Sequence, residues 1–202
     1  MAVKDHSLDE KIIDAATAEF MEHGFRKTSL RRIAARAGLT TGALYTRSAN
    51  KDQLFSSLVS GALNEIKEEL MPMRQVYMDA QQSGEPEKIM EAIRKEERIC
   101  LEVMFKYYDQ CILFFCRSDG SSVQQMLQSM MEYKAKETVE YFKSMAKKDV
   151  DFDGIEFIMS EQFHYYRQIL ERAYSKEKAM RCMQTVESFL EAGWKDFFEK
   201  IM

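Results

Sequence analysis

Proline and glycine are scarce in this sequence. The 202 residues include two prolines and eight glycines, whereas a sheet-rich fold needs turn-forming residues between most of its strands. Leu, Met, Glu, Lys and Ala, which favour helices, are plentiful instead. We therefore predict an all-α fold.

Long apolar segments are missing as well. The longest run, CILFFC at 111–116, is much shorter than the roughly 18 apolar residues that cross a membrane. The first ten residues, MAVKDHSLDE, hold no apolar segment typical of a secretion signal. We expect a soluble, cytoplasmic protein of one or two domains, since a domain usually holds about 100 to 200 residues.

Residues that build catalytic, metal and redox sites are few. The four cysteines form no C-x-x-C pair, so neither a disulfide nor a zinc site is predicted; they are Cys100, Cys111, Cys116 and Cys182. With three histidines and scattered glycines, the chain shows no nucleophile beside a base and no phosphate-binding loop. We predict no enzyme, no catalytic residue and no cofactor or metal. A redox-sensing thiol stays open as an alternative.

Acidic residues are absent between His23 and Lys51. This stretch contains seven basic residues and no Asp or Glu: Arg26, Lys27, Arg31, Arg32, Arg36, Arg47 and Lys51. Residues 1–51 carry a net charge of +3, and the rest of the chain carries −7. Such an asymmetry favours a polyanionic partner such as nucleic acid, while a solvated helix face is the alternative.

Apolar residues near the N-terminus recur at helical spacing. The spacing predicts a first helix over about 8–23. Ser7 and Glu10 match a capping box at its start, and Gly24 is typical of a helix end.

Two shorter helices are predicted next. Thr28 is expected to cap a second helix that ends at Gly38. Thr40 or Thr41 is expected to begin a third, very short helix that runs through Thr46. Two short helices joined at a glycine form a helix-turn-helix.

The stretch IIDAATAEFMEHGFRKTSLRRIAARAGLTTGALYTRSANKDQLF, residues 12–55, resembles the DNA-binding domain of the TetR family of transcriptional repressors. The elements A-x-x-x-F-x-x-x-G-F, I-A-x-x-A-G and L-Y-x-x-x-x-x-K-x-x-L all lie in register. The resemblance implies a three-helix head, a linking fourth helix and a larger helical domain that binds a small molecule and dimerises. We therefore predict a helix-turn-helix DNA-binding domain at residues 1–51, linked by a helix over about 50–70, and an effector-binding and dimerisation domain at residues 52–202.

The resemblance also implies which residues face DNA. The start of a recognition helix enters the major groove, and the long donor of Arg31 on the preceding helix could reach a guanine edge. The family holds phosphates at the positions of Tyr45, Arg47 and Lys51, and Thr28 lies at a helix N-terminus that favours an anion. The predicted DNA-binding residues are Thr28, Arg31, Thr40, Thr41, Gly42, Ala43, Tyr45, Thr46, Arg47 and Lys51.

Three positions in the head allow other interpretations. Tyr45 could be partly in the core, and Lys51 could be a surface lysine near a helix start. Ser48 stands where the family usually has an aromatic residue, so we expect a looser contact between the third and fourth helices. Leu44, Leu54 and Phe55 are expected to compensate.

The rest of the chain alternates helical segments with turns. Asn50 and Gln53 match a capping box for the fourth helix, which Pro72 should break after about Leu70. Further predictions are a loop at 83–86, a helix or broken pair up to about 117, a turn at 118–121, a helix over 122–147, a turn at 149–154, and helices over about 154–174 and 176–200.

Apolar stripes on the last two helices favour a subunit interface. Their steps of three and four are typical of helices that pack on partner helices. The predicted interface residues are Ile155, Met159, Gln162, Tyr166, Met183, Val186, Leu190, Gly193 and Phe197. Packing within a single subunit is the alternative.

Methionine and aromatic residues favour an adaptable ligand pocket in the second domain. The chain has fifteen methionines, and such side chains line promiscuous sites as well as ordinary cores. The predicted pocket residues are Glu97, Glu102, Phe105, Tyr108, Phe114, Tyr141, Phe163 and His164. They suit an apolar or cationic aromatic compound.

The sequence thus predicts a repressor that binds a palindromic DNA operator as a homodimer and is released by a small apolar or aromatic effector. Two alternatives remain open. Glu161 and His164 form a Glu-x-x-His pair that could hold a metal on a helical bundle, and the cysteines could respond to oxidants. A helix-turn-helix module that binds protein is the other alternative.

Overall fold

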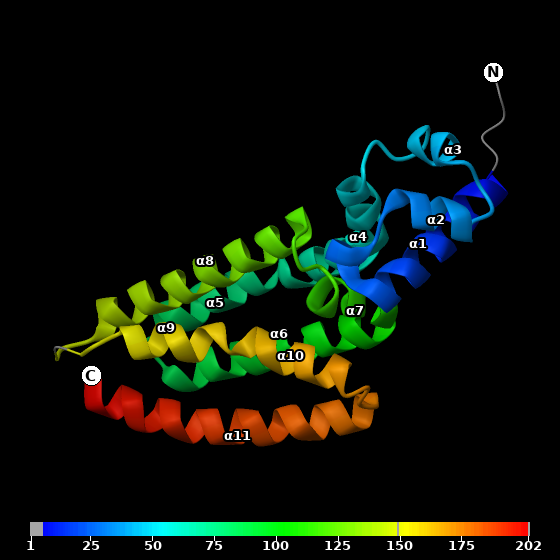
Figure 1. Ribbon diagram of the computed structural model, residues 1–202. Helices are drawn as coiled ribbons and strands as arrows, with labels where there is room; N and C mark the ends of the chain where they lie inside the picture. The colour runs from blue at the N-terminus through cyan, green and yellow to red at the C-terminus, as the bar shows by residue number, and fades with distance from the viewer. Residues whose placement is uncertain (1–5, 149, 202) are drawn as a thin grey trace. The chain divides into compact units, whose positions relative to one another are not determined.

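The computed structural model describes residues 6–148 and 150–201, with the side chains of residues 6–8 and 86 left aside. Every regular element in these ranges is a helix (Figure 1), so the predicted all-α fold is confirmed. The helices are α1 His6–Lys27, α2 Leu30–Arg36, α3 Thr41–Tyr45, α4 Lys51–Leu70, α5 Met73–Ser83, α6 Pro86–Lys106, α7 Tyr108–Cys116, α8 Ser122–Met145, α9 Asp153–Ser160, α10 Gln162–Glu171 and α11 Lys176–Ile201. Within the described chain, none of them is long and apolar enough to cross a membrane.

The chain divides into two units, each with its own apolar core. Unit 1 comprises Met1–Leu63 and Asp109–Leu127, and unit 2 comprises Asn64–Tyr108 and Gln128–Met202. Unit 1 therefore contains α7 and the first turns of α8 in addition to the N-terminal helices. The sequence pattern carries no signal for this grouping, because the two segments are far apart along the chain.

The core of unit 1 is built around three phenylalanines. The ring centroid of Phe55 on α4 lies 4.9 Å from that of Phe20 and 5.3 Å from that of Phe25, both on α1. Ile33 on α2 and Leu44 on α3 are fully buried in the same core. These contacts hold the short helices α2 and α3, which are too short to be stable alone.

The span α1 contains a break at Gly24, the predicted end of the first helix. The backbone leaves the helical conformation at Gly24, where φ is 69°. A positive φ costs glycine little energy and other residues more. The first helix therefore ends at Gly24 as predicted, and a separate short helical turn continues from there to Lys27. At the other end, the predicted capping box involves Ser7, whose side chain lies outside the described residues.

The segment 117–121 docks at this interruption. The carbonyl of Arg117 accepts a hydrogen bond of 2.8 Å from the Phe25 amide, and the Arg117 Nε donates to the carbonyl of Met21 at 2.8 Å. Nearby, the Asp52 carboxylate caps α8 by accepting from the Ser122 amide at 2.8 Å. These bonds explain why residues 109–127 belong to unit 1.

The observed helix caps correct one prediction and confirm two. Ser29, not Thr28, caps α2, because the Ser29 hydroxyl accepts from the amide of Arg32 at 3.4 Å. Thr40 caps α3 by accepting from the Ala43 amide at 3.2 Å, one of the two predicted starts. Asn50 is also confirmed as the cap of α4, because its Oδ1 accepts from the Gln53 amide at 2.7 Å, while Gln53 Oε1 accepts from the Ala49 amide at 2.8 Å rather than from that of Asn50.

Ser48 is accommodated inside the head. Its side chain is buried, and its hydroxyl donates a 3.1 Å hydrogen bond to the carbonyl of Asn50. Leu44, Leu54 and Phe55 are buried as well, as expected for residues that fill the space of the missing aromatic ring. The small side chain therefore leaves no unsatisfied hydroxyl among the described contacts.

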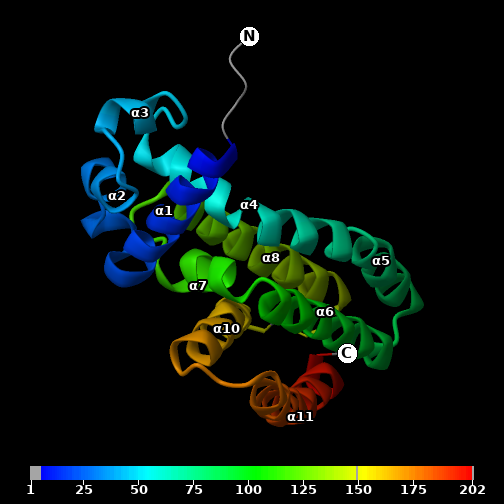
Figure 2. The same ribbon diagram turned by 90° about the vertical axis from the view of Figure 1, so that its right-hand side faces the viewer.

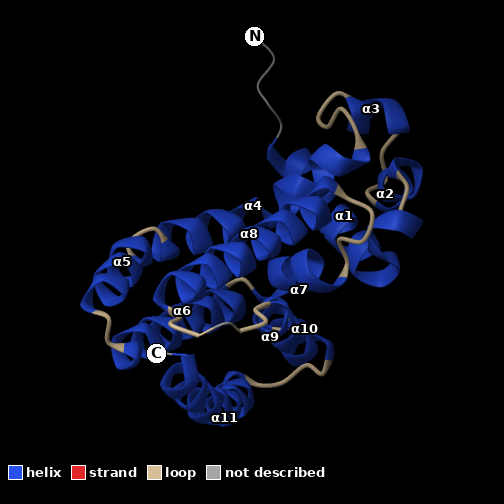
Figure 3. Ribbon diagram, turned by 90° about the vertical axis from the view of Figure 1, so that its left-hand side faces the viewer, coloured by secondary structure: helices blue, strands red, loops and turns tan. Residues whose placement is uncertain are grey.

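Unit 2 contains the remaining helices (Figure 3). Helix α6 packs against α5 and α11, while α9 and α10 follow one another and α11 returns beside them (Figure 1). The rings of Phe142 on α8 and Trp194 on α11 lie 5.4 Å apart in its core. The segment predicted as a helix or a broken pair up to about 117 is a broken pair, α6 and α7, which confirms the second form of that prediction. The segment predicted as one helix over 154–174 is instead split into α9 and α10.

Candidate nucleic-acid interface

Helices α2 and α3 form the predicted helix-turn-helix (Figure 2). Tyr45 at the end of α3 is 54% exposed, so its phenol is a surface group rather than part of the core. Arg31, Thr40, Gly42 and Thr46 are also exposed, and Thr41 and Ala43 are half-buried. The predicted recognition residues thus lie where a large partner could contact them.

Several basic side chains between His23 and Lys51 pair with carboxylates that lie outside this stretch in the sequence. Arg32 Nε lies 3.0 Å from Glu19 Oε2, and Arg36 Nη1 lies 3.1 Å from both Glu19 Oε1 and Glu22 Oε2. Glu19 is 6% exposed, which strengthens its pairing with two arginines. Helix α1 therefore supplies carboxylates that the local sequence lacks.

Two further arginines are also paired. Arg47 Nε lies 2.7 Å from Asp9 Oδ1, and Arg26 Nε lies 3.0 Å from Asp119 Oδ2. Among the seven basic residues from His23 to Lys51, only Lys27 and Arg31 are exposed and have no ion-pair or hydrogen-bond partner within the described part of the chain. The expectation of a uniformly unbalanced basic surface is thus corrected, because tertiary contacts bring acidic groups from α1 and from the turn after α7.

Lys51 and Thr28 serve the packing of unit 1. The Lys51 ammonium donates to the carbonyls of Phe25 at 2.8 Å and Thr28 at 3.0 Å, and it lies 4.2 Å from the centre of the Phe25 ring. Burial lowers the pKa of Lys51. The Thr28 hydroxyl is buried and donates to the carbonyl of Glu19 at 3.1 Å. A phosphate contact by either side chain stays a prediction.

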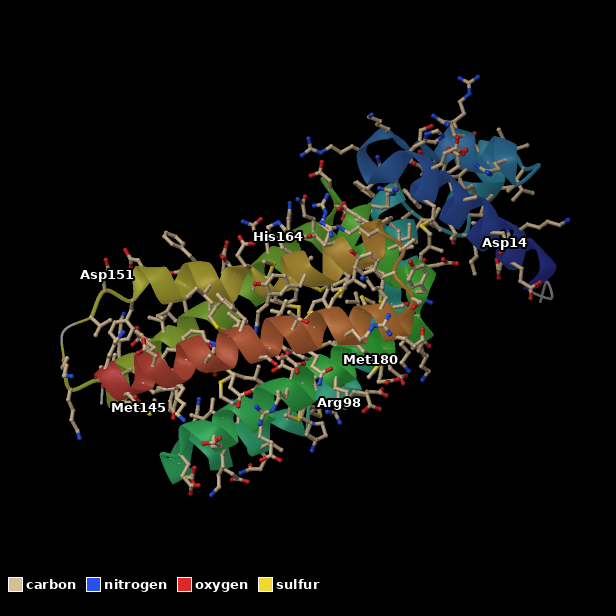
Figure 4. All side chains as sticks on the ribbon, turned by 90° about the horizontal axis from the view of Figure 1, so that it is seen from below. Asp14, Arg98, Met145, Asp151, His164 and Met180 are labelled. Atoms are coloured by element: carbon tan, nitrogen blue, oxygen red, sulfur yellow. The ribbon has the colours of Figure 1, made fainter. Side chains whose placement is uncertain are left out.

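The predicted pocket residues do not converge on one cavity. Phe114 belongs to the core of unit 1. Glu102 is exposed and pairs with Lys176 at 2.6 Å, and His164 is exposed on α10 (Figure 4). Phe105 stacks on Tyr108 with ring centres 5.9 Å apart, and Tyr141 packs beside Phe142. Phe163 packs on Tyr166 with ring centres 6.3 Å apart.

Of the predicted pocket residues, Glu97 lines a cavity found in unit 2, together with residues the sequence did not assign to it. The cavity lies among α6, α9, α10 and α11. Its lining residues are Met90, Ile93, Arg94, Glu97, Ile158, Met159, Gln162, Glu187, Leu190, Glu191 and Trp194. Helical periodicity marks most of these positions only as inward-facing, so it cannot separate a cavity wall from a filled core.

A part-buried polar network involves Glu96, the residue before the cavity-lining Glu97. The Tyr77 hydroxyl donates to Glu96 at 2.5 Å, and Lys134 pairs with the same carboxylate. Burial, together with the Glu96 charge, raises the pKa of the Cys100 thiol to about 12. Cys100 is therefore protonated at neutral pH and poorly suited to sensing oxidants, since the thiolate is the reactive form.

Comparison with known proteins identifies the N-terminal region. Residues 12–58 match the model of bacterial regulatory proteins of the tetR family. The similarity to the tetR family that this model shows lies in the N-terminal region of the chain. The matched residues include α2, α3 and the first turns of α4, and therefore the whole helix-turn-helix described above.

Individual relatives agree with this assignment. A probable acrEF/envCD operon repressor of Escherichia coli is 43% identical over 49 residues, which cover 24% of this chain and 22% of that protein. The uncharacterised HTH-type regulator YhgD of Bacillus subtilis is 25% identical over 162 residues, covering 76% of this chain and 80% of its own. The first of these alignments spans only about a fifth of its relative's length.

Solved structures extend the fold similarity to the whole chain. A TetR-like transcriptional regulator from Rhodococcus sp. RHA1 has a TM-score of 0.63 at 18% identity, covering 95% of this chain and 99% of that one. NalD, the secondary repressor of the MexAB-OprM multidrug efflux pump in Pseudomonas aeruginosa, has a TM-score of 0.54 at 18% identity, covering 90% and 96%. At such identities the similarity concerns the fold alone.

The TetR-type dimer stripe predicted from sequence is partly a core stripe. Ile155, Met159, Tyr166 and Met183 are between 3% and 9% exposed, so their side chains are covered within one subunit. Gln162, Val186, Leu190 and Phe197 are half-buried, and Gly193 is exposed. The stripe faces inward because α9, α10 and α11 surround the core of unit 2. The dimer itself stays a prediction.

Two groups of acidic and histidine side chains could offer ligands to a metal ion. His164 Nδ1 lies 3.1 Å from Glu161 Oε2, but both side chains are more than half exposed. Among the described residues, only Glu19, Glu22 and His23 bring three acidic, histidine or cysteine donor atoms within 4.8 Å of one another. Arg32 and Arg36 already pair with these carboxylates, and their charges oppose a bound cation. The cluster is therefore explained by ion pairing within the head.

Proposed function

We propose that this protein is a transcriptional repressor that binds operator DNA through α2 and α3. The observation that carries the proposal is the helix-turn-helix of a TetR-family segment with an exposed Tyr45 and an exposed, unpaired Arg31 beside it. The phenol supplies a phosphate contact, and the guanidinium supplies a donor for a guanine edge or a phosphate. Small residues at 41–43 let the start of α3 approach the bases closely.

Operator binding is tested with purified protein and the DNA that flanks its own gene. Tight binding that resists unrelated competitor DNA and weakens with salt is expected. Tyr45→Ala should reduce this binding, whereas Tyr133→Ala, which removes a tyrosine that is 65% exposed on α8, should not. Binding that is no tighter than to random DNA would contradict the proposal, and binding independent of salt would favour a protein partner instead.

We infer that the protein acts as a homodimer. Phe157 on α9 and Phe189 on α11 are 71% and 80% exposed, whereas Ile158 and Met180 are 41% and 42% exposed. Large apolar side chains left this open are typical of surfaces that a partner covers. Two-fold symmetry of the dimer would match a palindromic operator.

We further infer that a small-molecule effector binds unit 2 and weakens operator binding. Such a ligand must bind the DNA-free and DNA-bound states with different affinity, and a coupling of about 1 to 3 kcal/mol is typical. The division into a DNA-binding region at 1–51 and an effector-binding and dimerisation region at 52–202 belongs to the same proposal. Residues 109–127 belong to the second region in this division but pack in unit 1. Their role in the proposal is to stabilise the DNA-binding region.

A further inference from the structure

One buried carboxylate of α1 holds two arginines of α2. Glu19 is 6% exposed, and its two carboxylate oxygens lie 3.0 Å from Arg32 Nε and 3.1 Å from Arg36 Nη1. The contact with Arg36 is a hydrogen bond, whereas Glu19 Oε2 faces the Arg32 charge without the alignment of a hydrogen bond. Both arginine side chains are more than 40% exposed, so they lie at the surface of the head while their partner is buried.

The burial of Glu19 determines how firmly these arginines are held. A carboxylate removed from water is costly unless a positive charge stays beside it. Moving Arg32 and Arg36 to a phosphate would therefore leave Glu19 buried without that charge. The pair of Arg26 and Asp119 is different, because both side chains are more than 60% exposed and such a pair opens at little cost.

Glu22 supplies the second negative charge of this group. Its Oε2 accepts from Arg36 at 3.1 Å, and this hydrogen bond lowers the pKa of Glu22. The two carboxylates thus balance the two arginines. Because the Glu22 side chain is 57% exposed, water can replace Arg36 around it at little cost, and Glu19 is the residue that resists release.

Release of these arginines would change how the head meets DNA. The helix before the recognition helix crosses the phosphate backbone, and the exposed positions of α2 are Arg31, Arg32, Ala35 and Arg36. Phosphate contacts strengthen binding to every sequence, whereas contacts at the start of α3 depend on the bases. Free arginines on α2 would therefore raise the affinity for random DNA.

We propose that Glu19 is a positioning residue for operator specificity: it keeps Arg32 and Arg36 on the protein and so limits binding to random DNA. The inference rests on the proposed function, because it concerns how the same head selects its operator. In the operator complex the contacts of α3 fix the position of the head, so released arginines meet phosphates there only where the spacing fits. On random DNA the head can shift until they do.

The test compares the full-length protein with Glu19→Gln, which keeps the size of the side chain and removes its charge. Fluorescence anisotropy would measure binding to labelled operator DNA and to a labelled random duplex at several salt concentrations. The variant releases two arginines in each subunit of the proposed dimer, so the logarithmic salt slope on random DNA should steepen by up to about 3.6. At about 50 mM salt, random DNA should bind at least about tenfold more tightly, and the preference for the operator should fall.

Asp14→Asn is the matched control. Asp14 is exposed on α1 and has no ion-pair or hydrogen-bond partner in the described part of the chain (Figure 4). Its substitution removes the same unit of charge from the same helix without releasing an arginine, so the salt slope should stay unchanged. Adding Arg32→Ala and Arg36→Ala to Glu19→Gln should return the slope to the native value.

Glu22→Gln gives a second comparison at an exposed position, which keeps the test decisive if Glu19→Gln does not fold. Its salt slope on random DNA should equal the native slope, because Glu19 still holds both arginines. A slope as steep as the one expected for Glu19→Gln would contradict the inference.

Several outcomes with a folded Glu19→Gln protein would overturn the inference. These are an unchanged slope on random DNA, weaker binding to all DNA, as a merely structural role of Glu19 would produce, or equal gains in affinity for operator and random DNA. If the native protein prefers its operator, such a result contradicts only the role of Glu19. A native protein without that preference contradicts the proposed repressor, so the two failures are distinguishable.

Discussion

Arg31 and Arg32 are neighbours in the sequence with different surroundings in the structure. Arg31 is exposed with no described partner, whereas Arg32 lies 3.0 Å from the buried Glu19 and also hydrogen-bonds to His23. We predict that Arg31→Ala weakens operator binding and leaves folding unchanged. Arg32→Ala should instead destabilise the head and leave the salt dependence of DNA binding unchanged.

The expected size follows from counterion release. The logarithm of the binding constant falls with the logarithm of salt concentration by about 0.9 for each neutralised phosphate charge. A dimer loses two Arg31 side chains, so the slope should become shallower by about 1.8. Over a fourfold rise in salt, such as from 50 to 200 mM, the native protein should lose about tenfold more affinity than Arg31→Ala does.

Fluorescence anisotropy with labelled operator DNA at four salt concentrations would measure both slopes, and urea unfolding would measure both stabilities. The reasoning would be refuted if Arg32→Ala reduced the slope as much as Arg31→Ala. That result would show that the ion pair between Arg32 and Glu19 opens when DNA binds. Ion pairs in the free protein would then not predict which arginines contact phosphate.

Four other changes test the head, the dimer and the cavity. Lys51→Ala removes two hydrogen bonds to main-chain carbonyls and should lower the free energy of unfolding by about 2 kcal/mol, measured with urea. Ser29→Ala removes the cap of α2 and should cost about 1 kcal/mol in the same assay. Phe189→Glu should convert the dimer into monomers in sedimentation experiments; an unchanged dimer would place the interface elsewhere. Because burial, followed by the repulsion of Glu187, raises the pKa of Glu97 to about 8 in the folded protein, its proton is lost later than in the unfolded chain, so stability should fall by up to about 1.4 kcal/mol per pH unit between the two pKa values. Glu97→Gln should match the native chain at pH 4 and exceed its stability at pH 8; equal stability at both pH values would contradict the raised pKa.

Local patterns predicted much of the helical framework. Asn50 with Gln53, and Thr40, could be assigned as caps because a cap depends on contacts only three residues apart. The prediction that Thr28 caps α2 was wrong because the neighbouring Ser29 is the cap, while the Thr28 hydroxyl makes a long-range hydrogen bond to the carbonyl of Glu19. The break at Glu161 between α9 and α10 has no proline or glycine to mark it.

Some predicted site residues lie where the sequence placed them and others do not, because burial depends on tertiary packing. Exposure of Tyr45 and Arg31 agrees with their predicted place on the recognition surface. Apolar periodicity in α9 and α11, however, identifies one face of each helix without showing what that face meets. Ile155 and Met183 therefore belong to the core of their own subunit, while Phe157 and Phe189 remain outside it.

The sequence by itself determined the all-α fold, the helix-turn-helix and the similarity of residues 12–58 to the tetR family, because these depend on composition, on spacing within one or two helical turns and on a continuous motif. Only the tertiary structure decided which arginines are compensated, which stripe is core and where Glu97 meets Glu187. Those features depend on the burial and Coulomb interaction of groups tens of residues apart. Glu19 shows the difference most directly: it lies outside the basic stretch in sequence, yet it pairs with two of the arginines in that stretch.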